Sequence, residues 1–173
     1  MKILTPIAFL IFIFIGLQGF SQTFKKENTE VQTAGEAQAA TPELFKALGI
    51  SNSVNPKNST LTNNTVFIRQ IGEGNRAAIS TDTNASEVNL IQNGDQNGVN
   101  LDYTANTIYT NILQNGSFNL VKDFVYDRNV DASLELTQEG GNYFERFGTN
   151  EITKSLKFKQ TENSPDIIIR SYK

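Results

Sequence analysis

Hydrophobic and polar residues alternate along this chain in short runs, and the runs recur with a nearly fixed period. One complete unit lies between Ser86 and Leu101, where an alternating run ends at Gln92, passes through a glycine and an asparagine, and gives way to a second alternating run. The glutamine recurs at spacings of 22, 22, 24 and 22 residues. The positions are Gln70, Gln92, Gln114, Gln138 and Gln160. A period of this length indicates a repeat architecture.

Each repeat predicts two strands that flank a tight turn. Mostly aliphatic residues stand four and two positions before the glutamine, so in a strand they point to the same side as the glutamine. The glycine of the turn is Gly72, Gly94, Gly116 or Gly140, and the asparagine that follows is Asn75, Asn97, Asn119 or Asn142. The expected core consists of Val66, Ile68, Ala77, Ile79, Val88, Leu90, Val99, Leu101, Ile112, Val121, Leu134, Leu136, Leu156 and Phe158.

A single repeat cannot fold alone. Fixing the backbone costs about 1–2 kcal/mol per residue, whereas burying each of the few aliphatic side chains returns only about 1.5–3 kcal/mol. Repeats stacked about 4.8 Å apart pair their backbone groups and place like residues over like. The expected fold is therefore all-β, a β-solenoid of about five stacked strand–arc–strand rungs over residues 64–173.

The inward glutamines and asparagines need partners, because an unpaired buried amide costs about 1–3 kcal/mol. Amides stacked at the same position of every rung can donate to the rung on one side and accept from the rung on the other. A slip of one residue would break all these hydrogen bonds, so the amides specify the register. We interpret these glutamines and asparagines as a self-assembly ladder.

The repeats are not equally regular. Two extra residues in the connection between the third and fourth repeats, within 125–131, predict a loop that bulges outward. The fifth repeat has Glu162 in place of the turn glycine and Pro165 in place of the asparagine. A proline and charges at a terminal repeat would hinder further strand pairing there.

The N-terminal part has no such period. Residues 1–21 predict a secretory signal peptide, with a positive start, an apolar run from Ile3 to Leu17, and cleavage after Ser21 or Gln22. The apolar run is shorter than the roughly 20 residues that span a membrane. Residues 22–63 are expected to be a mostly disordered leader with a short helix at 42–48. The mature chain is therefore expected to be secreted.

Composition narrows the function. The chain has no cysteine and no histidine, which removes thiol chemistry, disulfides, and the commonest metal ligand and general base. The net charge of −3 is mild, so nucleic acid and anionic membranes are not expected partners. Glu73 and Asp95 near the turns could act as the acid and base of a polysaccharide-cleaving enzyme, but solvated turn carboxylates explain them better. We expect no enzyme activity, cofactor, metal or small-molecule substrate.

The repeat Ser-x-hydrophobic-x-hydrophobic-x-Gln-x-Gly-x-x-Asn-x-Ala-x-hydrophobic resembles the curlin repeat of bacterial curli fibres. Residues 86–101 follow it nearly throughout, and residues 70–79 are similar to repeats of the minor, nucleator subunit. The resemblance covers about residues 64–173. It implies an extracellular amyloid fibre subunit at the cell surface that contributes to biofilm matrix and adhesion. The implied partners are further copies of the chain, other curlin-like subunits, and the curli export and assembly machinery.

Curlin repeats usually carry a second glutamine eleven positions after the first. The corresponding residues here are Thr81, Tyr103, Val125, Thr149 and Ser171, so the second glutamine ladder is missing. This departure favours a nucleator-type or divergent subunit over the main fibre-forming subunit. The alternative is a secreted β-solenoid adhesin or binding module that does not polymerise. Its contacts could come from exposed aromatic residues, with Phe67, Tyr109, Phe124 and Tyr126 as candidates.

Overall fold

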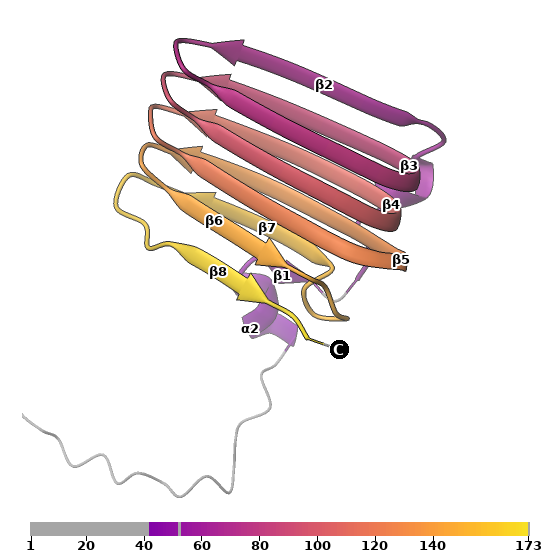
Figure 1. The fold of residues 1–173 in the computed structure, drawn as a ribbon. Coiled ribbons are helices and arrows are strands. Elements are labelled where there is room, and N and C mark those ends of the chain that lie inside the picture. Colours follow the sequence, from indigo (N-terminus) through magenta and orange to yellow (C-terminus); the bar gives the residue numbers. More distant parts are fainter. Residues whose placement is uncertain (1–41, 52, 173) are drawn as a thin grey trace, which may run out of the picture. The chain divides into compact units, whose positions relative to one another are not determined.

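The computed structural model describes residues 42–51 and 53–172 (Figure 1). All of them belong to the second of the chain's two units, Gln38–Lys173. The expected signal peptide and residues 22–41 of the expected leader lie outside the described residues. The elements are α2 (Pro42–Ala47), β1 (Ile50–Ser51), the 3₁₀ turn η1 (Asn58–Thr60), β2 (Asn64–Ile71), β3 (Arg76–Asn93), β4 (Gly98–Asn115), β5 (Leu120–Glu139), β6 (Tyr143–Phe147), β7 (Ser155–Gln160) and β8 (Ile167–Arg170).

The strands form a stack of parallel rungs, each with one strand in each of two facing layers. In Figure 1 the stack runs from β2 at the top to β8 at the bottom. The long strands β3, β4 and β5 each contain the second strand of one rung, the connecting arc, and the first strand of the next rung. We number the rungs in chain order: rung 1 is 64–83, rung 2 is 86–105, rung 3 is 108–127, rung 4 is 133–147 and rung 5 is 155–170. The expected all-β solenoid of about five rungs is confirmed.

The register follows the sequence period. Gln70 pairs with Gln92 across β2 and β3, and Gln92 pairs with Gln114 across β3 and β4. Inward residues of the two layers meet in one continuous hydrophobic core that includes Val88, Leu90 and Ile112, all with no exposed surface. Because side chains alternate between the two faces of a strand, each layer contributes a single layer of inward side chains to the core.

The turn glycines allow the arcs to stack closely. Gly94 has φ of 116°, and a Cβ atom there would lie 2.3 Å from the carbonyl oxygen of Gly116 on the next rung. A side chain would therefore collide with the backbone of the neighbouring arc, and the backbone angle itself favours glycine.

Two residues expected in the core are exposed. Val66 and Ile68 of β2 are 50% and 44% exposed, because rung 1 has a rung beneath it and, among the residues that the structure describes, none above it. Ala77, Ile79 and Phe158 are only partly buried against the core. The remaining expected core residues are buried: Val88, Leu90, Val99, Leu101, Ile112, Val121, Leu134, Leu136 and Leu156.

The two extra residues lie where the sequence placed them. Ala105 pairs with Asp127, but Thr107 pairs with Asp131, so β5 carries two additional residues at this arc. The bulge is exposed at Arg128 and Asn129. The Arg128 side chain extends to Asp82 of rung 1, with 2.5 Å between Nη2 and Oδ2.

The segment before rung 1 differs from the expected leader. Residues 42–51 and 53–63 pack along the solenoid: β1 pairs antiparallel with β7 of rung 5, and the chain then returns to rung 1. The helix α2 ends at Ala47, one residue before the expected end. The sequence period gave no sign of this packing, because a single short strand against an edge has no repeat.

Candidate functional site

The inward glutamines form a continuous hydrogen-bonded column through all five rungs. Each Nε2 donates to the Oε1 of the glutamine on the next rung, at distances of 2.6, 2.8, 2.9 and 2.9 Å. Gln92, Gln114 and Gln138 have no exposed surface. The column joins Gln70, Gln92, Gln114, Gln138 and Gln160 in chain order. In each of these hydrogen bonds the donor lies on one rung and the acceptor on the next, so donation runs in one direction from rung 1 to rung 5.

The asparagines form a second column at the arc. The backbone N–H of Asn97 donates to Oδ1 of Asn75 at 3.0 Å, and the backbone N–H of Asn119 donates to Oδ1 of Asn97 at 3.1 Å. The side-chain Nδ2 of Asn97 donates to the carbonyl of Gly116 on the next rung at 2.8 Å. The amide column thus ties each arc to its neighbour through backbone and side chain together.

Asn142 keeps its place in this column although it comes one residue early in the sequence. Its backbone N–H donates to Oδ1 of Asn119 at 3.2 Å. The shorter arc is built with two consecutive glycines, Gly140 and Gly141, which have φ of 75° and 64°. Left-handed backbone at both positions shortens the turn without disturbing the stack.

The glutamine column ends at rung 5 and the asparagine column ends at rung 4. The Nε2 of Gln160 donates to the backbone carbonyls of Tyr143 and Pro165, at 3.0 and 3.1 Å. Pro165 stands two residues before Ile167, which pairs with Phe144, so it occupies the level of Asn142 in the next rung. Proline has no N–H to donate and no side-chain amide, so the asparagine column cannot continue past rung 4.

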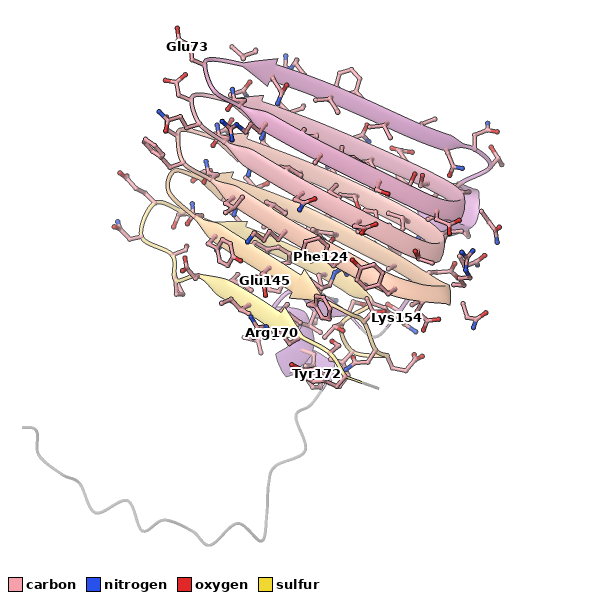
Figure 2. The ribbon with its side chains drawn as sticks, viewed as in Figure 1. Glu73, Phe124, Glu145, Lys154, Arg170 and Tyr172 are labelled. Atoms are coloured by element: carbon pink, nitrogen blue, oxygen red, sulfur yellow. The ribbon has the colours of Figure 1, made fainter. Side chains whose placement is uncertain are left out.

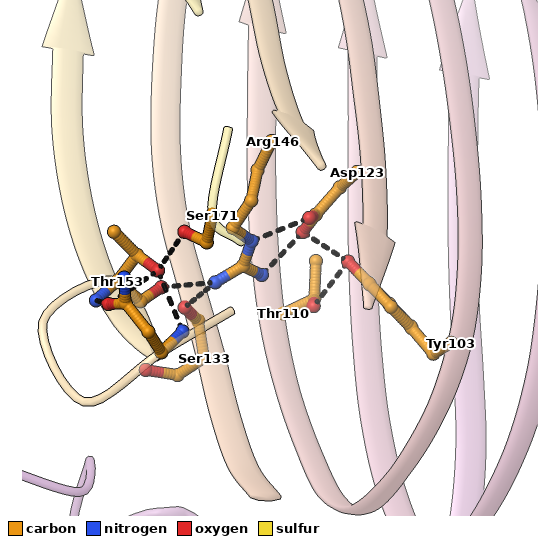
Figure 3. A network of polar contacts seen from close by, with 8 residues as sticks. Tyr103, Thr110, Asp123, Ser133, Arg146, Thr153 and Ser171 are labelled. Carbon is orange, nitrogen blue, oxygen red and sulfur yellow. Dashed lines mark hydrogen bonds and ion pairs between the residues drawn. The ribbon is translucent and has the colours of Figure 1, made fainter. Parts of the chain in front are cut away.

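The second half of the rungs holds a buried charged network that the repeat pattern did not predict (Figure 3). Asp123 and Arg146 pair in register on rungs 3 and 4, and both side chains have no exposed surface. Nε of Arg146 lies 2.6 Å from Oδ1 of Asp123, and Nη2 lies 2.7 Å from Oδ2. The hydroxyl of Tyr103 donates to the same carboxylate at 2.7 Å. A two-pronged pair with an added donor satisfies most of the carboxylate's acceptors.

Every nitrogen of Arg146 has a partner. Nη1 donates to the backbone carbonyls of Ser133 and Thr153, at 3.2 and 3.1 Å. Burial lowers the pKa of Arg146, but the Asp123 carboxylate more than offsets this, so the pKa lies above its ordinary value. Burial also raises the pKa of the Tyr103 phenol well above its ordinary value, and the Asp123 carboxylate raises it further. The network is therefore held as one neutral phenol and one charged pair.

A sequence signal for this network existed. The aligned inward positions of successive rungs are Leu101, Asp123, Arg146 and Ile169. An acid directly followed by a base in an otherwise apolar column predicts a pair. Asn142 comes one residue early, so the arc is one residue shorter. Counted from the glutamine, Arg146 therefore falls at an outward position, and its inward direction was not apparent.

Charged residues on the outer faces also pair between rungs. Lys157 and Glu135 lie 2.9 Å apart across the layer that holds the glutamines, and Arg170 and Glu145 lie 3.1 Å apart across the other (Figure 2). A hydrogen bond to Glu145 raises the pKa of Tyr143 to about 12, and the same bond together with Arg170 lowers the pKa of Glu145. These pairs hold strands in register from outside the core.

Glu73 and Asp95, which were weighed above as an acid and base and interpreted as solvated turn carboxylates, lie in the arcs. The backbone N–H of Glu73 donates to Oδ1 of Asp95 at 2.8 Å, and both residues are exposed. Asp95 thus serves as a backbone acceptor in stacked arcs. Within 42–51 and 53–172 no group of three or more acidic residues is placed to hold a metal ion, and no helix has the length and apolar content to span a membrane.

One comparison with known proteins gave a match. Residues 62–94 match the model of the curlin associated repeat, which spans rung 1 and the first strand of rung 2. No curated protein and no solved structure matches the chain. The match supports the expected resemblance: residues 62–94 carry a curlin associated repeat. Curlin repeats are found in curli-type subunits, a family of structural fibre proteins.

Proposed function

We propose that the mature chain is a secreted, curli-type amyloid subunit that acts by stacking solenoid rungs onto its own, at the cell surface and in the biofilm matrix. The observation that carries the proposal is the exposed edge of rung 1. Strand β2 is exposed along all eight residues, although it holds the same inward pattern as the buried strands below it.

Rung 1 offers each kind of interaction that holds the rungs together. Val66 and Ile68 present the apolar surface that Val88 and Leu90 bury one rung lower. The outer edge of β2 presents backbone groups to a parallel strand, and unpaired edges of this kind readily accept further strands. Each buried aliphatic side chain would contribute about 1.5–3 kcal/mol to the docking of another rung.

The charged network supports a nucleator-type or divergent role. Asp123 and Arg146 replace apolar residues in the core column, and a buried ion pair specifies register more than it adds stability. Such a stack suits a subunit that folds into one register before others add to it. Its proposed partners are other curlin-like subunits, further copies of the chain, and the curli-type export and assembly machinery.

An adhesin that does not polymerise is the second candidate. It is favoured by an aromatic cluster on the outer face of rungs 3 and 4, where the ring of Phe147 lies edge-on to Phe124 and Tyr126 at 6.2 and 6.0 Å. Phe147 and Tyr126 are about half exposed. Aromatic rings held in this way could stack on a sugar or a surface.

The proposal is tested by measuring whether the mature chain seeds fibre growth. The mature chain, residues 22–173, is added to a synthetic peptide of residues 86–105, which carries the most regular rung, and growth is followed with an amyloid dye. We expect a shorter lag and fibres with reflections near 4.7 and 10 Å. The matched control is Ile68→Lys, which places a charge on the exposed edge and should abolish seeding. A wild-type chain that leaves the lag of the peptide unchanged would refute the proposal and favour the adhesin.

A further inference from the structure

We infer that assembly is one-ended: another curlin-type chain docks on rung 1, while residues 49–51 and 53–61 close the β7 edge of rung 5 against further stacking. The inference rests on the proposed function and adds a direction to it. The occupant of the open edge is a parallel curlin rung whose glutamine amide is free to donate.

The closing segment lies on rung 5 in an orientation that no rung adopts. Ile50 and Ser51 of β1 pair antiparallel with Leu156 and Ser155 of β7, whereas all the pairings between rungs are parallel. The backbone N–H of Lys157 donates to the carbonyl of Gly49 at 2.7 Å. The segment therefore uses edge groups of β7 that a sixth rung would need.

Side-chain contacts hold the segment along the stack. Nδ2 of Asn58 donates to Oγ1 of Thr107 and to the carbonyl of Ala132, at 2.9 and 3.0 Å, and Asn58 is buried. Nδ2 of Asn55 donates to Oε1 of Glu135 at 3.0 Å. These contacts reach rung 4 and the residues just before rungs 3 and 4, so the segment is anchored away from the edge that it covers.

The two ends of the solenoid also differ in their polar groups. At rung 1 the Nε2 of Gln70 donates downward to Gln92, and within the described residues no group donates to Oε1 of Gln70. At rung 5 the Nε2 of Gln160 is already paired with the carbonyls of Tyr143 and Pro165. The glutamine column is thus open at its acceptor end and closed at its donor end.

The arc of rung 1 repeats this asymmetry. Nδ2 of Asn75 donates to the carbonyl of Gly94 below it, and Asn97 does the same to Gly116. By the same register, the carbonyl of Gly72 is placed to accept from an asparagine above it. At the rung 5 end, Pro165 has neither a backbone N–H nor a side-chain amide to continue the asparagine column.

These directions determine the partner. A rung on top of rung 1 must donate a glutamine amide downward to Oε1 of Gln70. A second copy of this chain does not offer that donor while Gln160 is paired and β1 covers β7. The occupant is therefore a curlin-type chain whose last rung is free, and stacking of this chain on itself requires the segment to detach.

Gly49 allows the segment to be detached in the full-length mature chain. It has φ of 76°, and a Cβ atom there would lie 1.9 Å from the carbonyl oxygen of Lys157. Gly49→Val should displace β1 from β7. The matched control is Thr60→Val, an exposed position of the same segment whose hydroxyl contacts only Lys57 within it.

The test compares self-assembly of these variants without the peptide. We expect Gly49→Val to polymerise at least about tenfold faster than the wild type, Thr60→Val to behave as the wild type, and Gly49→Val with Ile68→Lys to remain monomeric. Hydrogen exchange gives an independent readout. The amide of Lys157 should be protected in the wild type and exchange quickly in Gly49→Val, while core amides such as that of Leu90 stay protected and show that the solenoid is folded.

Equal polymerisation of the wild type and Gly49→Val would overturn the inference and leave the proposed function standing. Failure of every variant to polymerise, together with failure of the wild type to seed the peptide, would overturn the proposed function and one-ended assembly with it. A Lys157 amide that exchanges quickly in the wild type would show that the segment does not close rung 5, whatever the assembly result.

Discussion

Arg146 and Asp123 lie directly over one another on neighbouring rungs, and their side chains form a two-pronged ion pair inside the core, at 2.6 and 2.7 Å. Leu101 lies on one side of the pair in this column and Ile169 lies on the other. A buried pair of this kind repays its desolvation only while both partners are present, because a lone buried charge is not compensated.

Removing one partner should therefore destabilise the protein far more than removing both. We expect Arg146→Leu to lower the free energy of unfolding by about 3–5 kcal/mol, and the double variant Asp123→Leu with Arg146→Leu to be close to the wild type or more stable. The measurement is urea unfolding of the monomeric chain. Lys157→Ala, at an exposed pair, is the control and should change the free energy by less than about 1 kcal/mol. A double variant as unstable as the single one would contradict this account.

Tyr103 should not ionise while the protein is folded. Burial and the Asp123 carboxylate raise its pKa well above its ordinary value of 10.0. Above about pH 10 the phenol loses its proton in the unfolded chain but keeps it in the folded chain. Rising pH therefore favours the unfolded chain. The contribution to stability is thus complete below pH 10 and falls as the pH rises towards the folded pKa.

Ultraviolet titration of the phenolate measures this effect. In the wild type, the phenolate absorbance of one tyrosine should appear only when the chain unfolds. Tyr103→Phe should lack that late step and keep the others. The free energy of unfolding of Tyr103→Phe should also fall less steeply above pH 10. A variant whose late step is unchanged would show that another tyrosine is responsible.

The glutamine and asparagine columns should matter more than the outward polar residues of the same strands. Gln92→Ala leaves the buried Oε1 of Gln114 without its donor, and Asn97→Ala removes the acceptor for the backbone N–H of Asn119. Each should cost about 1–3 kcal/mol and slow assembly. Glu87→Ala and Asn89→Ala are the controls, since these half-buried outward residues hydrogen-bond each other. Equal effects of the two sets on unfolding and on fibre growth would argue against the inward ladder.

The turn glycines should differ in their tolerance of a side chain. Gly94→Ala brings a Cβ atom within 2.3 Å of the carbonyl oxygen of Gly116, whereas a Cβ atom at Gly140 would meet nothing within 4 Å. We expect Gly140→Ala to cost only the strain of a positive φ, about 1–2 kcal/mol, and Gly94→Ala to cost clearly more. Thermal unfolding of the two variants under the same conditions measures the difference. A larger loss for Gly140→Ala would contradict the close stacking of the arcs.

Much of the fold could be predicted from local pattern. The period of the glutamines predicted the number of rungs and the register of Gln92 over Gln114, because stacked repeats place equal positions above one another. The two extra residues near Arg128 were predicted by the longer spacing, and they enter the structure as an insertion between paired residues. The exposed Val66 and Ile68 were not predicted, since their pattern is the same as that of the buried rungs and only their place at the end of the stack exposes them.

The sequence by itself determined the repeat, the inward glutamines and the weakened fifth rung, because these depend on residue type at a fixed spacing. Only the tertiary structure decided that Arg146 turns inward to Asp123, because a shorter arc shifts the register without changing the pattern. It also decided that Gly49 to Ser51 lie against β7. That contact joins residues more than one hundred positions apart, and it forms because an otherwise unpaired strand edge is available to a segment that has no repeat of its own.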